Sequence, residues 1–261
     1  MPYILAIDTS TDACSVALLT PEVASEGVHQ TVVIAAREHT QRLLPMIDAL
    51  LKEHQVSLSQ LDAIAFCVGP GSFTGLRIAL STAQGLAYGA DLPLIPISTL
   101  ETLACTAVRL GFASPNQIII PSIDARMNEV YWSTYRSDAS GNLSALCDEN
   151  LSSPEHLAES EWVTHTKQQA IAGVGSGWQY DCLTNGIAVT SDAINATINA
   201  ATVTINAYPE AHDMALLAEK VYQQDIADSE KFISPLAAVP TYMRNEISWK
   251  KRTRIRTKET E

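Results

Sequence analysis

Apolar and polar positions along the first part of the chain alternate in runs that predict strands and helices in turn. Apolar runs at residues 3–7 and 14–19 enclose the polar segment DTSTDA, whose composition is typical of a tight turn between two strands. The same stretch predicts two more strands and two helices, in chain order at residues 31–38, 41–56, 61–68 and 75–90. We therefore expect a layered α/β unit here.

The second half of the chain repeats this order. Residues 116–124 and 130–136 predict two strands around a turn, so that Asp8 in AID and Asp124 in SID stand at equivalent strand ends. Further on, the pattern predicts a strand that runs into a glycine-rich turn, and then a strand followed by a helix with Pro209 at its first position. This indicates an internal duplication, with lobes at residues 1–104 and 105–235 and a C-terminal segment at 236–261.

Duplicated lobes that each begin with a strand pair and an Asp-bearing turn are typical of the actin-like ATPase and sugar-kinase architecture. In that α/β fold, each lobe has a mixed sheet flanked by helices, and the two turns face each other across a cleft that holds phosphates and a metal. Asp8 and Asp124 are then the two cleft carboxylates. Alternatively, each carboxylate only caps its own turn through a side-chain hydrogen bond. The pattern alone leaves both interpretations open.

The glycine-rich segment GPGSFTGLRI fits neither common phosphate-binding motif. A P-loop needs a lysine directly after Gly75, and a dinucleotide fingerprint needs one residue fewer between Gly71 and Gly75. One remaining interpretation is a weak anion site at the amides near Ser72 and Thr74. The other is a tight strand-to-helix turn, in which glycines let the backbone pass closely and Ser72 or Thr74 caps the helix.

The helix expected at residues 75–90 is apolar on all sides, which is typical of a helix buried on more than one face. One side can pack on its own sheet, and the other needs a second helix or another protein. In the preceding helix, Leu44 and Met46 lie off the main apolar stripe and are candidates for contact with a partner. An intramolecular helix pair with a few exposed apolar groups is the alternative.

Charge is distributed unevenly among the 261 residues, which carry a formal net charge of −12. Residues 1–249 have 11 basic and 27 acidic side chains, a net charge of −16 that would repel a nucleic-acid backbone. Only the basic tail could contact nucleic acid. The alternative is that the tail is a disordered, solubilising end of the chain. Its cations are Lys250, Lys251, Arg252, Arg254, Arg256 and Lys258. The chain shows neither a signal-peptide pattern nor an apolar span long enough for a membrane, so we expect a cytoplasmic protein without a membrane partner.

Six segments, taken in this order and spacing, resemble the TsaB family, also called YeaZ: ILAIDTSTDACSVAL, REHTQRLLPMIDALL, GPGSFTGLRIALSTAQGLA, ISTLETLA, DARMNEVYW and VPTYMRN. Members of this bacterial family are needed to form N6-threonylcarbamoyladenosine (t6A) at position 37 of tRNAs. The resemblance implies a two-lobed actin-like fold and a paralogue of the transferase TsaD. In TsaD-like sequences a His-x-x-x-His pair holds the catalytic metal, whereas Thr99 and Leu103 stand at the matching positions here. The resemblance therefore implies an accessory subunit that has no catalytic residues and no metal or cofactor of its own, since ATP and metal belong to the partner subunits.

The resemblance also implies the partners. It implies a scaffold that binds and activates TsaD together with the ATPase TsaE, that forms a homodimer through the same surface, and that meets tRNA only through the complex. The expected surface lies on the first two helices and comprises Arg42, Leu43, Leu44, Met46, Ile47, Leu76, Arg77, Ile78, Ala79 and Leu80. Within it, we expect Leu43→Asp to abolish TsaD binding and to leave the fold intact.

The phosphate-type loops are interpreted as vestigial. Their residues are Asp8, Thr9, Ser10, Gly69, Gly71, Ser72, Thr74, Gly75 and Asp124. The alternative function is an active actin-like ATPase or kinase that uses a nucleotide at the cleft between the lobes.

Overall fold

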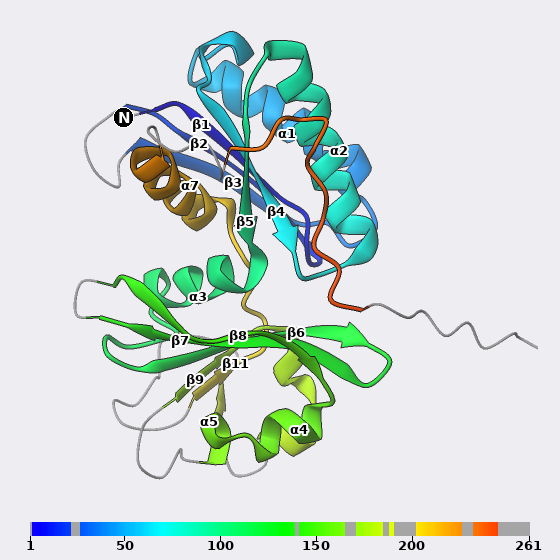
Figure 1. Ribbon diagram of the computed structural model, residues 1–261, viewed down its shortest axis with the longest axis vertical. Helices are drawn as coiled ribbons and strands as arrows, with labels where there is room; N and C mark the ends of the chain where they lie inside the picture. Colours follow the sequence, from blue (N-terminus) through cyan, green and yellow to red (C-terminus); the bar gives the residue numbers. More distant parts are fainter. Residues whose placement is uncertain are drawn as a thin grey trace, which may run out of the picture.

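The protein consists of two lobes, each built on one mixed β-sheet with helices against its faces (Figure 1). The computed structural model describes residues 2–21, 27–138, 141–164, 171–184, 188–190, 202–225 and 232–244. This architecture confirms the expected α/β class with two lobes that each carry a mixed sheet. The basic tail after residue 244 lies outside the described residues.

The sheet of the first lobe has the strand order β3-β2-β1-β4-β5. Strands β1 and β2 are antiparallel with Asp8 opposite Ser15, whereas β4 and β5 continue the sheet in parallel. Every residue of β1 and β2 is buried, because helices cover both faces of this sheet; such strands read as continuous apolar runs. The strand bounds are Ile4–Asp8, Ala13–Leu19, Val28–Ile34, Ala63–Gly69 and Leu94–Ser98.

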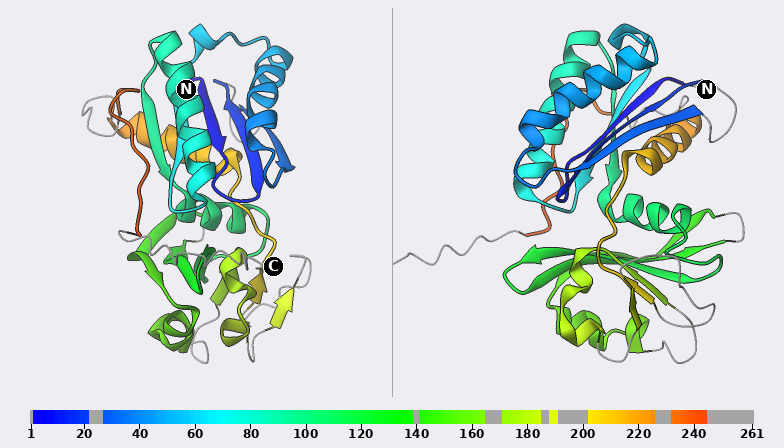
Figure 2. Two further views of the ribbon diagram at one scale, coloured as in Figure 1. Left: turned by 90° about the vertical axis from the view of Figure 1, so that its right-hand side faces the viewer. Right: turned by 180° about the vertical axis from the view of Figure 1, so that it is seen from behind.

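Three long helices enclose this sheet. Helices α1 (His39–Glu53) and α2 (Phe73–Ala90) lie on one face, and α7 (Ala211–Asp225) lies on the other (Figures 1 and 2). A short 3-10 turn, η2 (Leu58–Gln60), leads from α1 into β4. Helix α2 begins directly after Ser72, whose hydroxyl accepts a hydrogen bond from the Gly75 amide at 3.3 Å. Ser72 is therefore the expected helix cap.

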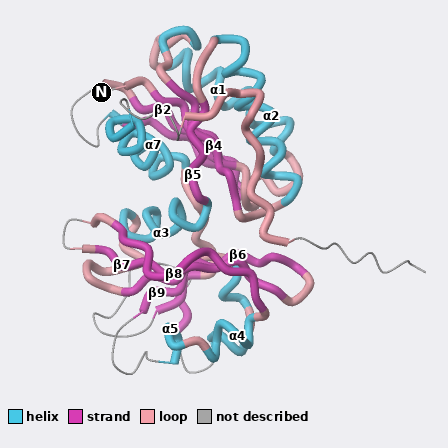
Figure 3. Tube along the Cα trace, viewed as in Figure 1, coloured by secondary structure: helices cyan, strands magenta, loops and turns pink. Residues whose placement is uncertain are grey.

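The sheet of the second lobe has the order β10-β11-β9-β6-β7-β8. Helix α3 (Thr99–Arg109) packs on one face, and the short helices α4, η4, α5 and α6 pack on the other (Figure 3). The strand bounds are Ile118–Arg126, Glu129–Ser137, Leu143–Ser152, Ile171–Val174, Ala188–Thr190 and Thr202–Thr204 for β6 to β11. The short helices span Pro154–Glu159, Glu161–Thr164, Ser176–Gln179 and Asp181–Thr184 for α4, α5, η4 and α6.

The lobes are not the two continuous segments 1–104 and 105–235 that we expected. Helix α3 begins at Thr99, and its Leu100 and Leu103 belong to the core of the second lobe. Helix α7 returns to the first lobe, where Met214 and Ala218 join the core beside β1. The helix begins at Ala211 rather than at Pro209. Tertiary packing therefore decides which sheet each helix covers.

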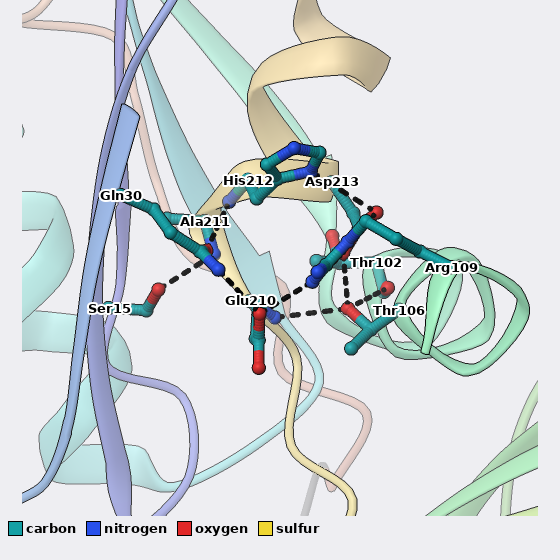
Figure 4. A network of polar contacts seen from close by, with 9 residues as sticks. All are labelled: Ser15, Gln30, Thr102, Thr106, Arg109, Glu210, Ala211, His212 and Asp213. Atoms are coloured by element: carbon teal, nitrogen blue, oxygen red, sulfur yellow. Dashed lines mark hydrogen bonds and ion pairs between the residues drawn. The ribbon is translucent and has the colours of Figure 1, made fainter. Parts of the chain in front are cut away.

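A network of polar contacts joins α3 of the second lobe to the start of α7 on the first (Figure 4). The Arg109 guanidinium bonds both carboxylate oxygens of Asp213, with N···O distances of 2.9 to 3.0 Å, and contacts Glu210 at 2.5 Å. Burial opposes ionisation of Asp213, but the nearby His212 ring, the hydrogen bonds from Arg109 and Thr106, and the charge of Arg109 hold its pKa below the usual value. Charged, hydrogen-bonded groups at this depth fix the two helices relative to each other.

Residues 232–244, named here the C-terminal strap, cross from the first lobe to the second. Ile233 bridges to Leu94 on β5, and the Gln84 side chain of α2 donates to the carbonyls of Pro235 and Ala238 at 2.7 and 3.1 Å. In Figure 1 the strap descends beside α2 toward the space between the lobes. Among the described helices, none is both long and apolar enough to cross a membrane.

Candidate functional site

The glycine loop between β4 and α2 packs directly against the turn between β1 and β2. The Ser72 amide donates to the Ser10 carbonyl at 2.8 Å, and the Thr9 hydroxyl donates to the Gly75 carbonyl at 2.7 Å. A Cβ atom added to Gly75 would lie 1.9 Å from the Thr9 carbonyl oxygen, and one added to Gly71 would lie 2.6 Å from that of Ser10. These two glycines are therefore required by the close approach of two backbone segments.

Asp8 lies at the end of β1, beneath this contact, and is buried. Its Oδ1 accepts hydrogen bonds from the Ser10 amide at 2.8 Å and the Ser10 hydroxyl at 2.7 Å. Its Oδ2 is buried and has no hydrogen-bond partner among the described residues. Burial raises the pKa of Asp8 from 3.8 to about 6, against the lowering effect of the bonds from Ser10.

Folding raises the pKa of Asp8, so the folded state favours the protonated carboxyl. The carboxyl therefore stabilises the fold at low pH, and this stabilisation is lost as the pH rises. The shift from 3.8 to about 6 corresponds to about 3 kcal/mol, which is lost between about pH 4 and 6. Relative to Asp8→Asn, the wild-type free energy of unfolding is expected to fall by up to about this amount over that interval. Urea unfolding at stepped pH measures it, with Asp12→Asn in the same turn as the control. Parallel curves for wild type and Asp8→Asn would contradict the assignment.

Asp124, the equivalent residue of the second lobe, also has local partners. Its Oδ1 accepts from the Arg126 amide at 2.8 Å and the Tyr180 hydroxyl at 3.1 Å, and its Oδ2 contacts the Arg126 guanidinium at 3.0 Å. Each aspartate therefore organises its own turn, as the simpler interpretation of the sequence required. Among the described residues, the two carboxylates share no hydrogen-bond partner.

Positions 99 and 103 match the metal-binding histidines of TsaD-like sequences. In this chain they hold side chains that pack in the interior. Thr99 and Leu103 are both fully buried. Leu103 lies against the turn at Gly175, where an added Cβ would come within 2.8 Å of its Cδ2 atom. In the described part of the chain, no group of three or more His, Cys, Asp or Glu is placed to hold a metal. The absence of metal and cofactor in this chain stays a prediction.

The prediction of the partner surface is wrong for half of its residues, because their side chains face the core. Leu43 is only 1% exposed, and the other inward residues join it in the core of the first lobe. Leu43 and Ile47 lie on the main apolar stripe of α1, which packs into the core of the first lobe. The misplaced residues are Leu43, Ile47, Leu76, Ala79 and Leu80. The expectation that Leu43→Asp leaves the fold intact is also wrong, since it would bury an unpaired charge.

The outward side of these two helices carries different apolar residues. Leu44 is 53% exposed, Phe73 46% and Tyr88 71%. Met46 and Ile78 are half-buried, and Arg42 and Arg77 are exposed. We name Leu44, Met46, Phe73, Ile78 and Tyr88 the α1/α2 face. Sequence reasoning found Leu44 because it lies off the stripe, but it missed Phe73 and Tyr88. Phe73, Arg77 and Ser81 are four residues apart and lie on one side of α2. The polar residues Arg77 and Ser81 were the available signal that this side is exposed.

The sequence is similar to known proteins over most of its length. The family model for the tRNA N6-adenosine threonylcarbamoyltransferase TsaD matches residues 24–251. The tRNA threonylcarbamoyladenosine biosynthesis protein TsaB of Haemophilus influenzae is 40% identical over 256 residues, which are 95% of this chain and 96% of the relative. The protein of the same name from Escherichia coli is 37% identical, over 95% of this chain and 97% of its own. The chain belongs to the TsaB family. This confirms the resemblance seen in the sequence.

Solved structures of TsaB relatives have the same fold. YeaZ from Pseudomonas aeruginosa has a TM-score of 0.75 and 34% identity, and the match covers 93% of this chain and 100% of that one. A second structure, described as an uncharacterized protein with similarity to peptidase YEAZ from Pseudomonas aeruginosa, has a TM-score of 0.76 and 34% identity over 94% of this chain and 100% of its own. The two mixed sheets with flanking helices in this chain form the actin-like fold.

Proposed function

We propose that this chain is an accessory subunit of t6A synthesis, which binds and activates a TsaD-type transferase together with a TsaE-type ATPase. The observation that carries this proposal is the α1/α2 face, on which three large apolar side chains stand exposed on two adjacent helices. Exposed apolar patches with charged neighbours are typical of protein interfaces. Gly85 and Gly89 on α2 add room for close approach, since nothing lies within 4 Å of a Cβ added to either.

A non-catalytic role is supported by the loop that most resembles a phosphate site. Backbone atoms of Thr9 and Ser10 lie so close to Gly75 and Gly71 that a Cβ atom would not fit at either glycine. These glycines are therefore explained by the packing of the chain itself and need no bound phosphate. The replacement of two expected histidines by Thr99 and the packed Leu103 points the same way. The resident ATP and metal are then held by the partner subunits.

The partners follow from the same surface and from charge. Without a transferase, the α1/α2 face can bury itself against a second copy, which gives a homodimer. A net charge of −16 over residues 1–249 disfavours a direct tRNA contact by the lobes, so tRNA is met through the complex. As a subunit of a tRNA-modifying complex, the protein acts in the cytoplasm.

The decisive experiment measures threonylcarbamoyl transfer to unmodified tRNA in a mixture of a TsaC-type synthase, a TsaD-type transferase and a TsaE-type ATPase. Modification is expected only when this chain is added, and this chain without the transferase is expected to give none. Unchanged modification in its absence would contradict the scaffold role. Stoichiometric ATP binding by the chain alone would instead support the alternative of an active ATPase or kinase.

A further inference from the structure

Arg77 on α2 lies beside two neighbouring aromatic rings. Its guanidinium carbon lies 3.6 Å from the ring centre of Phe73, one helical turn earlier, and 5.7 Å from that of Tyr242 on the strap. Its Nε atom donates to the Tyr242 hydroxyl at 2.9 Å, and the two rings are 5.4 Å apart. A stacked and hydrogen-bonded arginine has lost most of its side-chain freedom before any partner arrives.

Contacts of the strap residues before and after Tyr242 fix its position. The Thr241 amide donates to the Val68 carbonyl at the end of β4, at 2.8 Å. Two residues after Tyr242, the Arg244 guanidinium forms an ion pair with Glu129 on β7 and reaches the carbonyl of Ala125, near the end of β6, at 3.3 Å. Tyr242 is therefore fixed between contacts to the first lobe and contacts to the second.

Among the residues that the structure describes, no carboxylate forms an ion pair with Arg77. Arg42, Lys52, Arg109, Arg126 and Arg244 all form ion pairs with carboxylates. Arg77 is exposed, and within the described residues its guanidinium donates one hydrogen bond, to the Tyr242 hydroxyl. No described residue accepts a hydrogen bond from its two Nη groups, which are donors suited to an acceptor on a partner.

We propose that Arg77 is the charged anchor of the α1/α2 face and binds a carboxylate of the TsaD-type partner, with Phe73 and Tyr242 as positioning residues. This inference rests on the function proposed above and names the chemistry that the surface recognises. Phe73 belongs to the α1/α2 face and also contacts the guanidinium of Arg77. Arg77 therefore lies at the edge of the apolar surface that the partner would cover. A guanidinium in a fixed orientation suits the two oxygens of a carboxylate.

Charge favours an acidic side chain of a protein over the phosphates of RNA. A single carboxylate meets Arg77 with apolar surface beside it, whereas a polyanion would also meet the net charge of −16 carried by residues 1–249. Because Arg77 is already ordered, little side-chain entropy is lost when the pair forms.

The test is titration calorimetry of the full-length chain with the TsaD-type transferase at several salt concentrations. Arg77→Gln is expected to weaken the affinity by about tenfold to a hundredfold and to flatten its salt dependence. Tyr242→Phe removes only the hydroxyl that fixes Arg77 and is expected to weaken binding by about threefold. The double variant should bind like Arg77→Gln alone, because the hydroxyl acts through the guanidinium. Arg136→Gln, which removes an exposed arginine of the second lobe, is the matched control.

The outcomes separate this inference from the proposed function. If the wild-type chain does not bind the transferase, the proposed function fails and the inference fails with it. If wild type binds and Arg77→Gln binds equally well, only the inference is overturned. A variant that keeps its affinity for the transferase but loses affinity for isolated tRNA would also overturn it, because Arg77 would then serve a phosphate. Thermal melts of all variants confirm that the exposed substitutions leave the fold intact.

Discussion

The double variant Leu44→Asp/Tyr88→Asp is expected to lose at least about a hundredfold in affinity for a TsaD-type transferase while it remains folded. Both side chains are more than half exposed, so the free subunit pays little for the change. In the complex each new carboxylate would be buried in an apolar contact without a partner. Calorimetry measures the affinity, and light scattering on a sizing column reports whether the homodimer is lost as well.

Two variants sharpen this test. Ile34→Asp changes an apolar side chain on strand β3 that is 63% exposed but lies outside the α1/α2 face, and it should bind the transferase normally. Leu43→Asp, next to Leu44 but only 1% exposed, should fail to fold. If the double variant binds as well as wild type, the docking surface lies elsewhere on the molecule.

Gly75→Ala is expected to destabilise the protein by about 3 kcal/mol or more, a large share of the free energy of unfolding of a typical domain. The added methyl group would lie 1.9 Å from the Thr9 carbonyl oxygen, a backbone atom held by the β1–β2 hairpin. Neither the hairpin nor the first turn of α2 can move away without breaking hydrogen bonds between them. Urea unfolding followed by circular dichroism measures the loss.

Gly85→Ala is the matched control, since it makes the same change in the same helix. Nothing lies within 4 Å of a Cβ added there, so alanine should raise the free energy of unfolding by up to about 1 kcal/mol through its better helix propensity. Equal unfolding midpoints for the two variants would show that the contact between the glycine loop and the Thr9 turn is loose.

Local patterns predicted those parts of the molecule that local forces determine. The buried strands appeared as apolar runs, the turn at Asp8 was identified by its polar composition, and Ser72 caps α2 as its position after the glycines suggested. The placement of Leu44 outside the apolar stripe of α1 correctly marked it as exposed. Each of these features depends on residues within a few positions of one another.

Features that depend on distant segments were not predictable in the same way. Helix α2 is rich in apolar and small residues on all sides, so its sequence did not show that Leu76 and Ala79 face the sheet. The strap has no periodicity, although VPTYMRN is part of the family resemblance. Its role arises only when Tyr242 meets Arg77, 165 positions earlier in the chain.

The return of α7 to the first lobe has a consequence for synthesis on the ribosome. Residues 211–225 cover the face of the first sheet opposite α1 and α2, and Met214 and Ala218 are part of its core. During translation the strands made first therefore keep one apolar face uncovered until about four fifths of the chain has been produced. A nascent chain arrested before α7 should be a substrate for chaperones, and the first lobe should not accumulate as a free fragment.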